Sequence, residues 1–156
     1  MTDATYFQAR HCAAQWRPFL VALFDRLAAG LPAEEGAQLL RQVGVDMAQQ
    51  LTLGAKGSLA ELEQAINGQW QALDWGELQI RSDGKALVLE HRHYPVPYQQ
   101  GQPSQPAMQA LGQVLEGVYS AWLQAQGGDP QVKARLVACD RHGLRFRYGQ
   151  EEAALA

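Results

Sequence analysis

The hydrophobic periodicity of this chain changes near its middle, and this change limits the possible folds more than any other feature. Up to Leu73, apolar residues recur every three or four positions, which is the spacing of one face of an α-helix. After Trp75 and Gly76 the period is two, because Leu78 and Ile80 alternate with polar residues as in a half-buried strand. The sequence therefore predicts an α+β fold, with helices first and strands later.

Three helices are expected before the change of period. Pro18 stands inside the first apolar stripe, so that helix either starts or bends there. Pro32, followed by two glutamates, predicts the start of the second helix, and Ser58 with Glu61 predicts a capping box at the start of the third. The three stripes are Trp16, Phe19, Leu20, Leu23, Phe24 and Leu27; Leu39, Leu40, Val43, Met47 and Leu51; and Leu59, Leu62, Ile66, Trp70 and Leu73.

Small residues in the second helix predict a close helix packing. Gly44 and Ala48 lie four positions apart beside the apolar stripe. Because small side chains let another helix approach closely, we expect a tight helix crossing at this point.

The second half of the chain predicts two hairpins separated by one helix. The first hairpin covers residues 77–93 and turns at residues 82–85, where Gly84 suits a tight turn. A loop rich in proline and glutamine follows at residues 94–106, and Ser104 caps a long helix with Met108, Leu111, Leu115, Val118 and Trp122 on one face. The second hairpin covers residues 132–148. The expected fold is thus three N-terminal helices, a β-hairpin, a long helix and a β-hairpin, with the helices packed on an antiparallel sheet in a single domain of residues 1–156.

Composition excludes several classes of protein. The net charge of −3 argues against a nucleic-acid-binding protein, which usually carries a basic excess. No apolar run approaches the length needed to cross a bilayer, so membrane insertion is not expected. Residues 1–8 lack the features of a signal peptide, and Cys12 and Cys139 suit reduced thiols, so a cytoplasmic location is favoured over the periplasm. Charged residues make up only 19% of the chain, which hints at surface hidden in a homo-oligomer.

The sequence carries no convincing catalytic motif. Phosphate-binding and dinucleotide-binding glycine loops are absent, as is the glycine-flanked serine of the α/β-hydrolases. Adjacent carboxylates, such as Glu34 with Glu35, fall at helix starts or on polar faces, where solvated surface is the simpler explanation. We therefore expect neither an enzyme nor a bound cofactor.

Histidines and a cysteine give the best metal candidate, and it is a weak one. His91 and His93 alternate on one strand, and Cys139 lies three residues before His142, which are ligand types that suit zinc. The two pairs are far apart in the sequence, and neither spacing is typical of a zinc finger. The favoured interpretation has no metal, with polar residues at strand ends and Cys139 half-buried.

Cationic residues gather on the last hairpin. Lys133, Arg135, Arg145 and Arg147, with Arg92 and Arg141 nearby, predict one basic face of the sheet. This face would either bind an acidic segment or anionic ligand, or keep sheet edges from pairing with other chains; the second explanation is favoured.

Aromatic residues divide into two groups by position. Trp16, Trp70 and Trp122 fall on the apolar stripes, so core packing is expected for them rather than sugar stacking. Tyr94 and Tyr98 lie in the loop, where contacts with other molecules are expected.

Three segments resemble the D-subunit family of cellulose synthase. They are Val43-Gly44-x-x-Met47-Ala48 in the second helix, Leu73-Asp74-Trp75-Gly76 at the change of period, and Leu115-Glu116-Gly117-Val118-Tyr119-x-x-Trp122 in the fourth helix. The last is the most specific. Their order and spacing match as well, so the resemblance covers roughly residues 39–122, and the total length also agrees with that of the family.

That resemblance implies an accessory protein of bacterial cellulose synthesis, an exopolysaccharide pathway of biofilms, without glycosyltransferase activity. It implies a homo-oligomer in which dimers assemble into an octamer, associated with cellulose synthase subunits and, in some members, with a proline-rich scaffold protein. The implied role is to organise synthase complexes or to guide β-1,4-glucan chains toward crystalline cellulose. Tyr94, Tyr98, Arg145 and Arg147 are the candidate contacts for a partner or for glucan.

A second resemblance concerns the fold alone. Helices followed by hairpin, helix and hairpin look like the ligand-binding fold of vinyl-4-reductase-type sensors. It implies, as an alternative, a small-molecule sensor with an apolar pocket between helices and sheet. A shared fold does not by itself establish a function.

Overall fold

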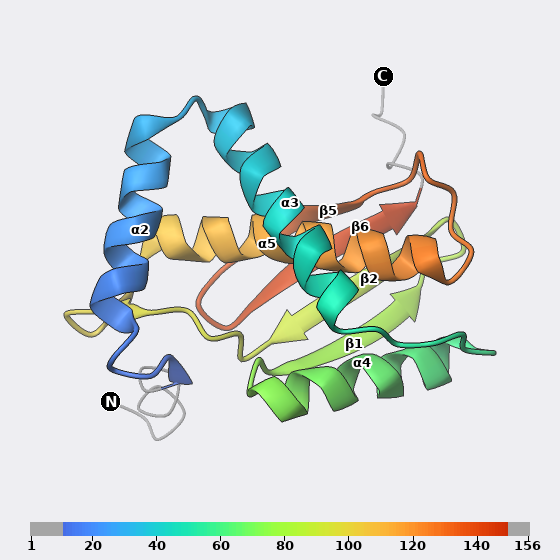
Figure 1. Ribbon diagram of the computed structural model, residues 1–156. Helices are drawn as coiled ribbons and strands as arrows, with labels where there is room; N and C mark the ends of the chain where they lie inside the picture. The colour runs from blue at the N-terminus through green and yellow to red at the C-terminus, as the bar shows by residue number, and fades with distance from the viewer. Residues whose placement is uncertain (1–10, 150–156) are drawn as a thin grey trace.

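The computed structural model describes residues 11–149, and the elements follow the expected order (Figure 1). The helices are α2 (Arg17–Gly30), α3 (Ala33–Gln50), α4 (Leu59–Leu73) and α5 (Gln105–Ala125). The strands are β1 (Glu77–Ser82), β2 (Ala86–Arg92), β3 (Tyr98–Gln99), β4 (Gln102–Pro103), β5 (Ala134–Cys139) and β6 (Gly143–Gly149). The predicted α+β class is confirmed. Residues 1–8, on which the expectation of no signal peptide depends, lie outside the described part.

Local sequence explains how the helices begin. Pro18 occupies the first turn of α2, where a missing amide hydrogen costs nothing, so it starts the helix and does not bend it. Ser58 caps α4 by accepting a hydrogen bond from the Glu61 amide at 3.1 Å, and the Glu61 carboxylate accepts one from the Gly57 amide at 3.0 Å. The predicted capping box is present, with its second bond displaced by one residue.

The two hairpins join in one antiparallel sheet of strand order β1-β2-β6-β5. The central pair is β2 with β6, in which Leu89 lies opposite Phe146 and His91 opposite Leu144. These four side chains are buried on the inner face, whereas Arg145 and Arg147 project from the outer face. A β-bulge interrupts β5 between Leu136 and Ala138.

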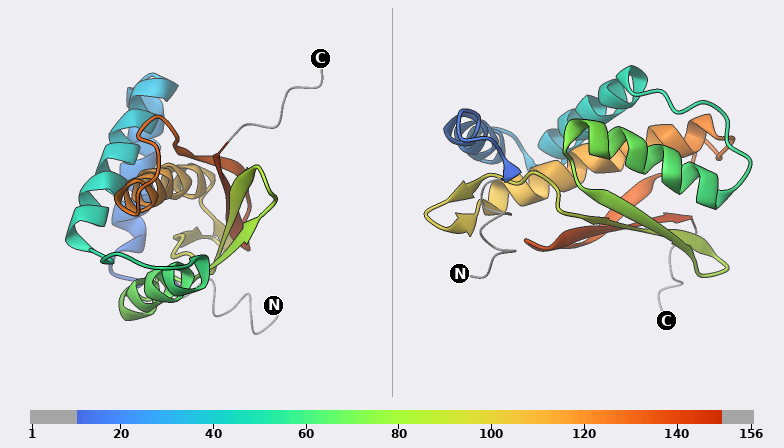
Figure 2. Two further views of the ribbon diagram at one scale, coloured as in Figure 1. Left: turned by 90° about the vertical axis from the view of Figure 1, so that its right-hand side faces the viewer. Right: turned by 90° about the horizontal axis from the view of Figure 1, so that it is seen from below.

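The molecule has three layers, which are the sheet, helix α5, and helices α3 and α2. Helix α5 lies across the inner face of the sheet, and α3 crosses α5 on the side away from the sheet, with α2 beside it (Figures 1 and 2). Helix α4 runs along the β1 edge of the sheet. Because α5 is sandwiched, nearly all of its faces are buried, and the core is centred on Leu115, Val118 and Tyr119. No helix within residues 11–149 is long and apolar enough to cross a membrane.

Two glycines allow α3 and α5 to cross in close contact, as predicted from Gly44. A Cβ atom on Gly44 would lie 1.8 Å from the Val114 carbonyl oxygen, and one on Gly117 would lie 1.9 Å from the Arg41 carbonyl oxygen. Ala48 continues this buried surface of α3. Each helix therefore presents a glycine to the backbone of the other, and no larger residue fits without separating them.

The predictions for Trp16, Tyr94 and Tyr98 are wrong. Trp16 is 53% exposed and not part of the core, because α2 starts after it and buries Val21 and Phe24 instead. Tyr94 and Tyr98 are buried, because residues 94–104 fold back against the core and form the short β3–β4 hairpin. The Tyr94 hydroxyl donates a hydrogen bond to the Asp140 carbonyl at 2.7 Å. Neither tyrosine is thus available for the outward contacts expected of them.

Candidate functional site

A chain of hydrogen bonds runs through the core between the helices and the sheet. The Trp70 indole donates to the Tyr119 hydroxyl at 2.9 Å, and that hydroxyl is 2.5 Å from His91 Nδ1. His91 Nε2 lies 2.7 Å from the Trp75 carbonyl oxygen. Since a carbonyl only accepts, Nε2 carries the hydrogen, and Nδ1 accepts from Tyr119. A neutral histidine therefore satisfies every polar group of this network.

Burial keeps this network uncharged. Removal from water lowers the pKa of His91 to about 4, partly opposed by the hydrogen bond to Trp75. Burial also raises the pKa of Tyr119 well above its ordinary value. Neither group titrates near neutral pH, and both are enclosed, so the network holds α4, α5 and β2 together and does not present an acid or base to a substrate.

The Leu73-Asp74-Trp75-Gly76 segment builds the turn from α4 into β1. Asp74 adopts a left-handed conformation that ends the helix, and Gly76 has φ of 96°. A Cβ on Gly76 would lie 2.0 Å from the Arg92 carbonyl oxygen, so only glycine fits beside β2. Trp75 stacks on Trp70 with 5.5 Å between ring centroids and supplies the carbonyl that binds His91. The motif therefore fixes the helix-to-strand connection.

Glu116 closes one edge of the sheet from inside. This buried carboxylate accepts a hydrogen bond from the Leu136 amide of β5 at 2.8 Å and is 3.2 Å from Arg41 of α3. One turn further along α5, the Ser120 hydroxyl accepts from the Ala134 amide at 2.8 Å. The two β5 amides that point away from β6 are thus hydrogen-bonded to side chains of α5, which hinders another strand from pairing with β5.

The opposite edge is closed in the same way by α4. Asn67 exchanges two hydrogen bonds with Leu78 of β1, at 2.7 and 2.9 Å. Glu63 accepts from the Ile80 amide at 2.8 Å. Of the two glutamates in the first turns of α4, Glu61 therefore caps the helix and Glu63 binds the edge strand β1.

Most of the remaining family-motif residues also lie in the core, whereas Val43 and Leu73 are exposed. The Trp122 indole donates to the Leu51 carbonyl at 2.8 Å and so ties α5 to the end of α3. Leu115 and Val118 are fully buried, and Met47 packs against the same cluster. The buried residues that carry the resemblance thus determine how the layers pack, and Glu116 and Gly117 also line a hollow of about 430 Å³ beside Arg41.

The weak metal candidates are not brought together as a site. His91 uses both ring nitrogens in the core network, whereas His93 follows β2 with a positive φ of 60° and is exposed with His142. Burial raises the pKa of Cys139, which disfavours the thiolate that binds metal. Within residues 11–149 no group of three histidine, cysteine or acidic side chains is placed to hold an ion. Cys12 and Cys139 are both free thiols.

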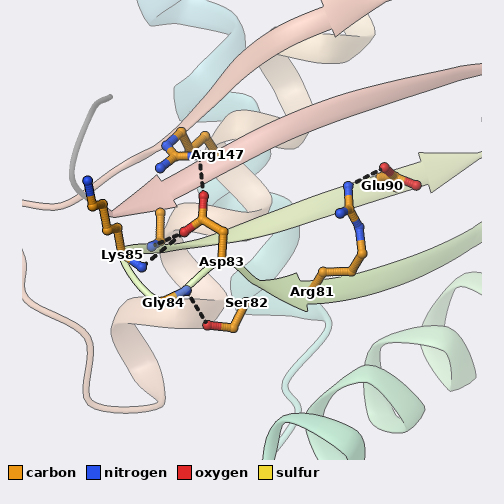
Figure 3. Close-up of polar contacts among 8 residues, drawn as sticks. Arg81, Ser82, Asp83, Gly84, Lys85, Glu90 and Arg147 are labelled. Carbon is orange, nitrogen blue, oxygen red and sulfur yellow. Dashed lines mark hydrogen bonds and ion pairs between the residues drawn. The ribbon is translucent and has the colours of Figure 1, made fainter. Parts of the chain in front are cut away.

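The outer face of the sheet is the first exposed surface with a distinct character. Arg81 lies 2.7 Å from Glu90 across β1 and β2, and Arg147 lies 2.7 Å from Asp83 in the β1–β2 turn. Both ion pairs are drawn in Figure 3. Hydrogen bonds from the Ala86 and Lys85 amides, followed by that from Arg147, lower the pKa of Asp83 to about 2. Asp83 thereby fixes both the turn and the position of Arg147.

Large apolar side chains are also exposed on the helical hairpin of α2 and α3 and at the N-cap of α2. Trp16, Phe19 and Leu23 are exposed along α2, and Trp16 and Phe19 are in edge-to-face contact with 6.2 Å between ring centroids. Leu39 and Val43 are exposed on α3, one turn apart. We call these five residues the α2–α3 apolar surface. The hydrophobic periodicity predicted that all five would be buried, because periodicity cannot tell which of two apolar faces packs inward.

Arg81, Glu90 and Asp83 were not among the residues predicted from the sequence to form a site. The alternation in β1 and β2 placed Arg81 and Glu90 on one face, which was a usable signal, but it did not show which strands would be neighbours. The pairing of β2 with β6 brings Arg145 opposite Glu90 and joins the two hairpins into one charged surface.

These observations define an α+β protein whose distinctive buried polar side chains hold layers and sheet edges together, with an apolar and a cationic surface left for contacts. The model of the cellulose synthase D-subunit family matches residues 2–149. The chain therefore belongs to this family of cellulose synthase D subunits.

Curated relatives agree with this assignment. The chain is similar to a cellulose synthase operon protein D of Komagataeibacter xylinus, with 30% identity over 92 residues. A protein of the same description from Komagataeibacter sucrofermentans gives the same identity over the same length. Each match covers 58% of this chain and 57% of the relative's own length.

Proposed function

We propose that this chain is a non-catalytic accessory subunit of bacterial cellulose synthesis that assembles with copies of itself. The observation that carries the proposal is the α2–α3 apolar surface on a chain of this family. Five large apolar side chains are exposed on the helical hairpin of α2 and α3 and at its start, and a contiguous apolar patch there would be typical of an interface. The engagement of His91 and Glu116 in the core supports a role without catalysis.

Self-association is expected to bury this surface. Trp16 and Phe19 are large aromatic side chains, the kind that contributes most to binding energy in the centre of an interface. A two-fold dimer would pair the surface with itself, and further contacts between dimers would give the octamer that the family resemblance implies.

A matched pair of variants tests this surface. Phe19→Ser with Leu23→Ser removes apolar area from α2, whereas Leu59→Ser with Leu73→Ser removes a comparable exposed area from α4. Multi-angle light scattering should give a multiple of the monomer mass for the parent and the α4 variant, and a smaller mass for the α2 variant. A monomeric parent would refute self-assembly, and an unchanged α2 variant would place the interface elsewhere.

The cellular role proposed is to organise synthase complexes, or to guide β-1,4-glucan chains, so that cellulose crystallises. Partners would be cellulose synthase subunits, glucan and, where encoded, a proline-rich scaffold protein. Deleting the gene should reduce cellulose crystallinity while the synthase stays active in membranes. Unchanged cellulose yield and crystallinity would reject this role.

A cytoplasmic location is proposed with it, supported by the two free cysteines, which suit a reducing compartment. Fractionation of cells carrying a tagged copy tests the location. The alternative of a small-molecule sensor gains no support, because the space between α5 and the sheet is filled by Tyr119, Phe146 and Leu89, all fully buried.

A further inference from the structure

The outer face of the sheet carries no helix of its own within residues 11–149, in contrast to the inner face (Figure 2). Alternation and register place Arg81 of β1, Arg92 of β2 and Arg145 of β6 on this outer face. Glu90 lies among them on β2. These four residues are called the Glu90 cluster.

Charge within the Glu90 cluster is unbalanced. The Glu90 carboxylate is 2.7 Å from Arg81, 3.3 Å from Arg145 and 3.8 Å from Arg92, so one anion serves three cations. Each arginine side chain is more than half exposed, at 53%, 54% and 60%, whereas that of Glu90 is only 16% exposed. The guanidinium groups therefore keep donors directed toward solvent, while the carboxylate beneath them is already engaged.

Two hollows border this cluster and share Arg145. One, of about 540 Å³, lies toward the β2 and β6 ends, where Arg92, His93 and His142 line it. The other, of about 510 Å³, lies toward β5 and is lined by Arg81 and Val137. Both are open, and together they extend across the face on either side of Arg145.

We propose that this face binds an extended acidic segment of a partner protein. Charge complementarity selects the ligand, since arginine pairs well with carboxylates. An extended peptide with carboxylates at alternate positions presents them on one face about 7 Å apart, so that successive carboxylates can reach Arg81, Arg145 and Arg92 on three neighbouring strands. Val88 and Val137, exposed or half-exposed between the arginines, offer contacts for its intervening aliphatic side chains.

An extended peptide suits this face better than a small anion. The donors are side chains spread over three strands on an open surface, not backbone amides gathered around one enclosed point as in phosphate-binding loops. Strand addition is also disfavoured for the peptide, because α4 and α5 side chains occupy outward amides of both edge strands. The segment is therefore held across the face by its side chains.

Binding of a labelled peptide of alternating Glu and Val tests the proposal, with Gln-Val and Lys-Val peptides as probes of charge. Fluorescence anisotropy at about 50 mM NaCl should show binding of the Glu-Val peptide alone, weakened at least about tenfold at about 500 mM NaCl. Arg145→Glu should weaken binding by at least about tenfold. Arg26→Glu, an equal change of charge at an exposed position of α2, should leave it within about twofold.

Four outcomes would overturn the proposal. An equal loss of peptide affinity in Arg145→Glu and Arg26→Glu would mean that binding is a general attraction between opposite charges. No binding of the peptide to the parent would mean that the arginines only keep the sheet from pairing with other chains. Competition by inorganic phosphate at the same concentration of charge would indicate a small-anion site. A changed oligomer mass for Arg145→Glu would make the face a contact between copies. Because this binding does not depend on the α2–α3 apolar surface, Phe19→Ser with Leu23→Ser should retain it even if self-assembly fails.

Discussion

Acidification should loosen the core at His91, because this histidine is held neutral among Trp70, Trp75 and Tyr119. In the folded protein its pKa is about 4, against an ordinary value of 6.5. Between these two pH values the unfolded chain binds a proton at this position and the folded protein does not. Stability therefore rises with pH through this window and is lost as the pH falls below about 6.5.

The size of the loss follows from the two pKa values. Their full difference corresponds to about 3 kcal/mol, reached once the pH falls below about 4. At about pH 5 the unfolded imidazole is almost fully protonated while the folded one remains neutral. Roughly 2 kcal/mol should therefore be lost between about pH 7.5 and pH 5.

Urea unfolding at a series of pH values measures this change, with His91→Gln as the matched variant. A glutamine amide can donate to the Trp75 carbonyl but does not titrate, so the free energy of unfolding of the variant should change less over this window. The other histidines are common to both proteins and cancel in the difference.

Parallel stability curves for the parent and His91→Gln between about pH 7.5 and pH 5 would refute this reasoning. If the variant does not fold, the ring resonances of His91 in the parent give an independent answer by NMR. They should keep the pattern of the neutral form with a hydrogen on Nε2 down to about pH 5. A midpoint near 6.5 would show that the ring is open to solvent protons.

The helix crossing and the sheet edge give further tests. Gly44→Ala should lower the free energy of unfolding by at least about 1–3 kcal/mol, because the new methyl group meets the backbone of α5. Gly68→Ala in α4, which has open space around it, should raise the free energy of unfolding by about 0.5–1 kcal/mol. Chemical denaturation of both variants compares these effects. Leu115→Ala should cost about 2–5 kcal/mol in the same assay, and a melt like that of the parent would show that the α5 packing is misassigned. Glu116→Ala should speed hydrogen exchange at the Leu136 amide, whose bond it removes, and unchanged exchange would contradict the edge contact.

Local and periodic features of the fold could be predicted from the sequence. The change of period at Trp75, the Ser58 cap and the small residue Gly44 each have a cause within a few positions of the chain, and the structure confirms all three. The inward side of β6 was also predictable, because Leu144 and Phe146 alternate with arginines.

Features that depend on distant partners could not be predicted in this way. Helix α2 is apolar on two sides, and only the position of α5 decides that Phe24 packs inward and Phe19 does not. The Pro- and Gln-rich composition around Tyr94 and Tyr98 suggested solvent, but tertiary contacts return the segment to the core. His91 shares the inward alternation of Leu89, yet its burial depends on the Tyr119 hydroxyl, 28 positions away in the sequence.

The closed edges of the sheet determine which kinds of assembly remain open to this fold. Unprotected edge strands can pair with other chains through backbone hydrogen bonds. Here the outward backbone amides of the two edge strands are already bonded to side chains of α4 and α5, namely Asn67, Glu63, Glu116 and Ser120. Contacts must then form through side chains, on helices or on the outer sheet face. Helices α2 and α3 and the outer face of the sheet lie on opposite sides of α5 (Figure 2), so a contact on one side can leave the other accessible. The organising role proposed above would use two such independent surfaces, one for its own copies and one for the machinery it arranges.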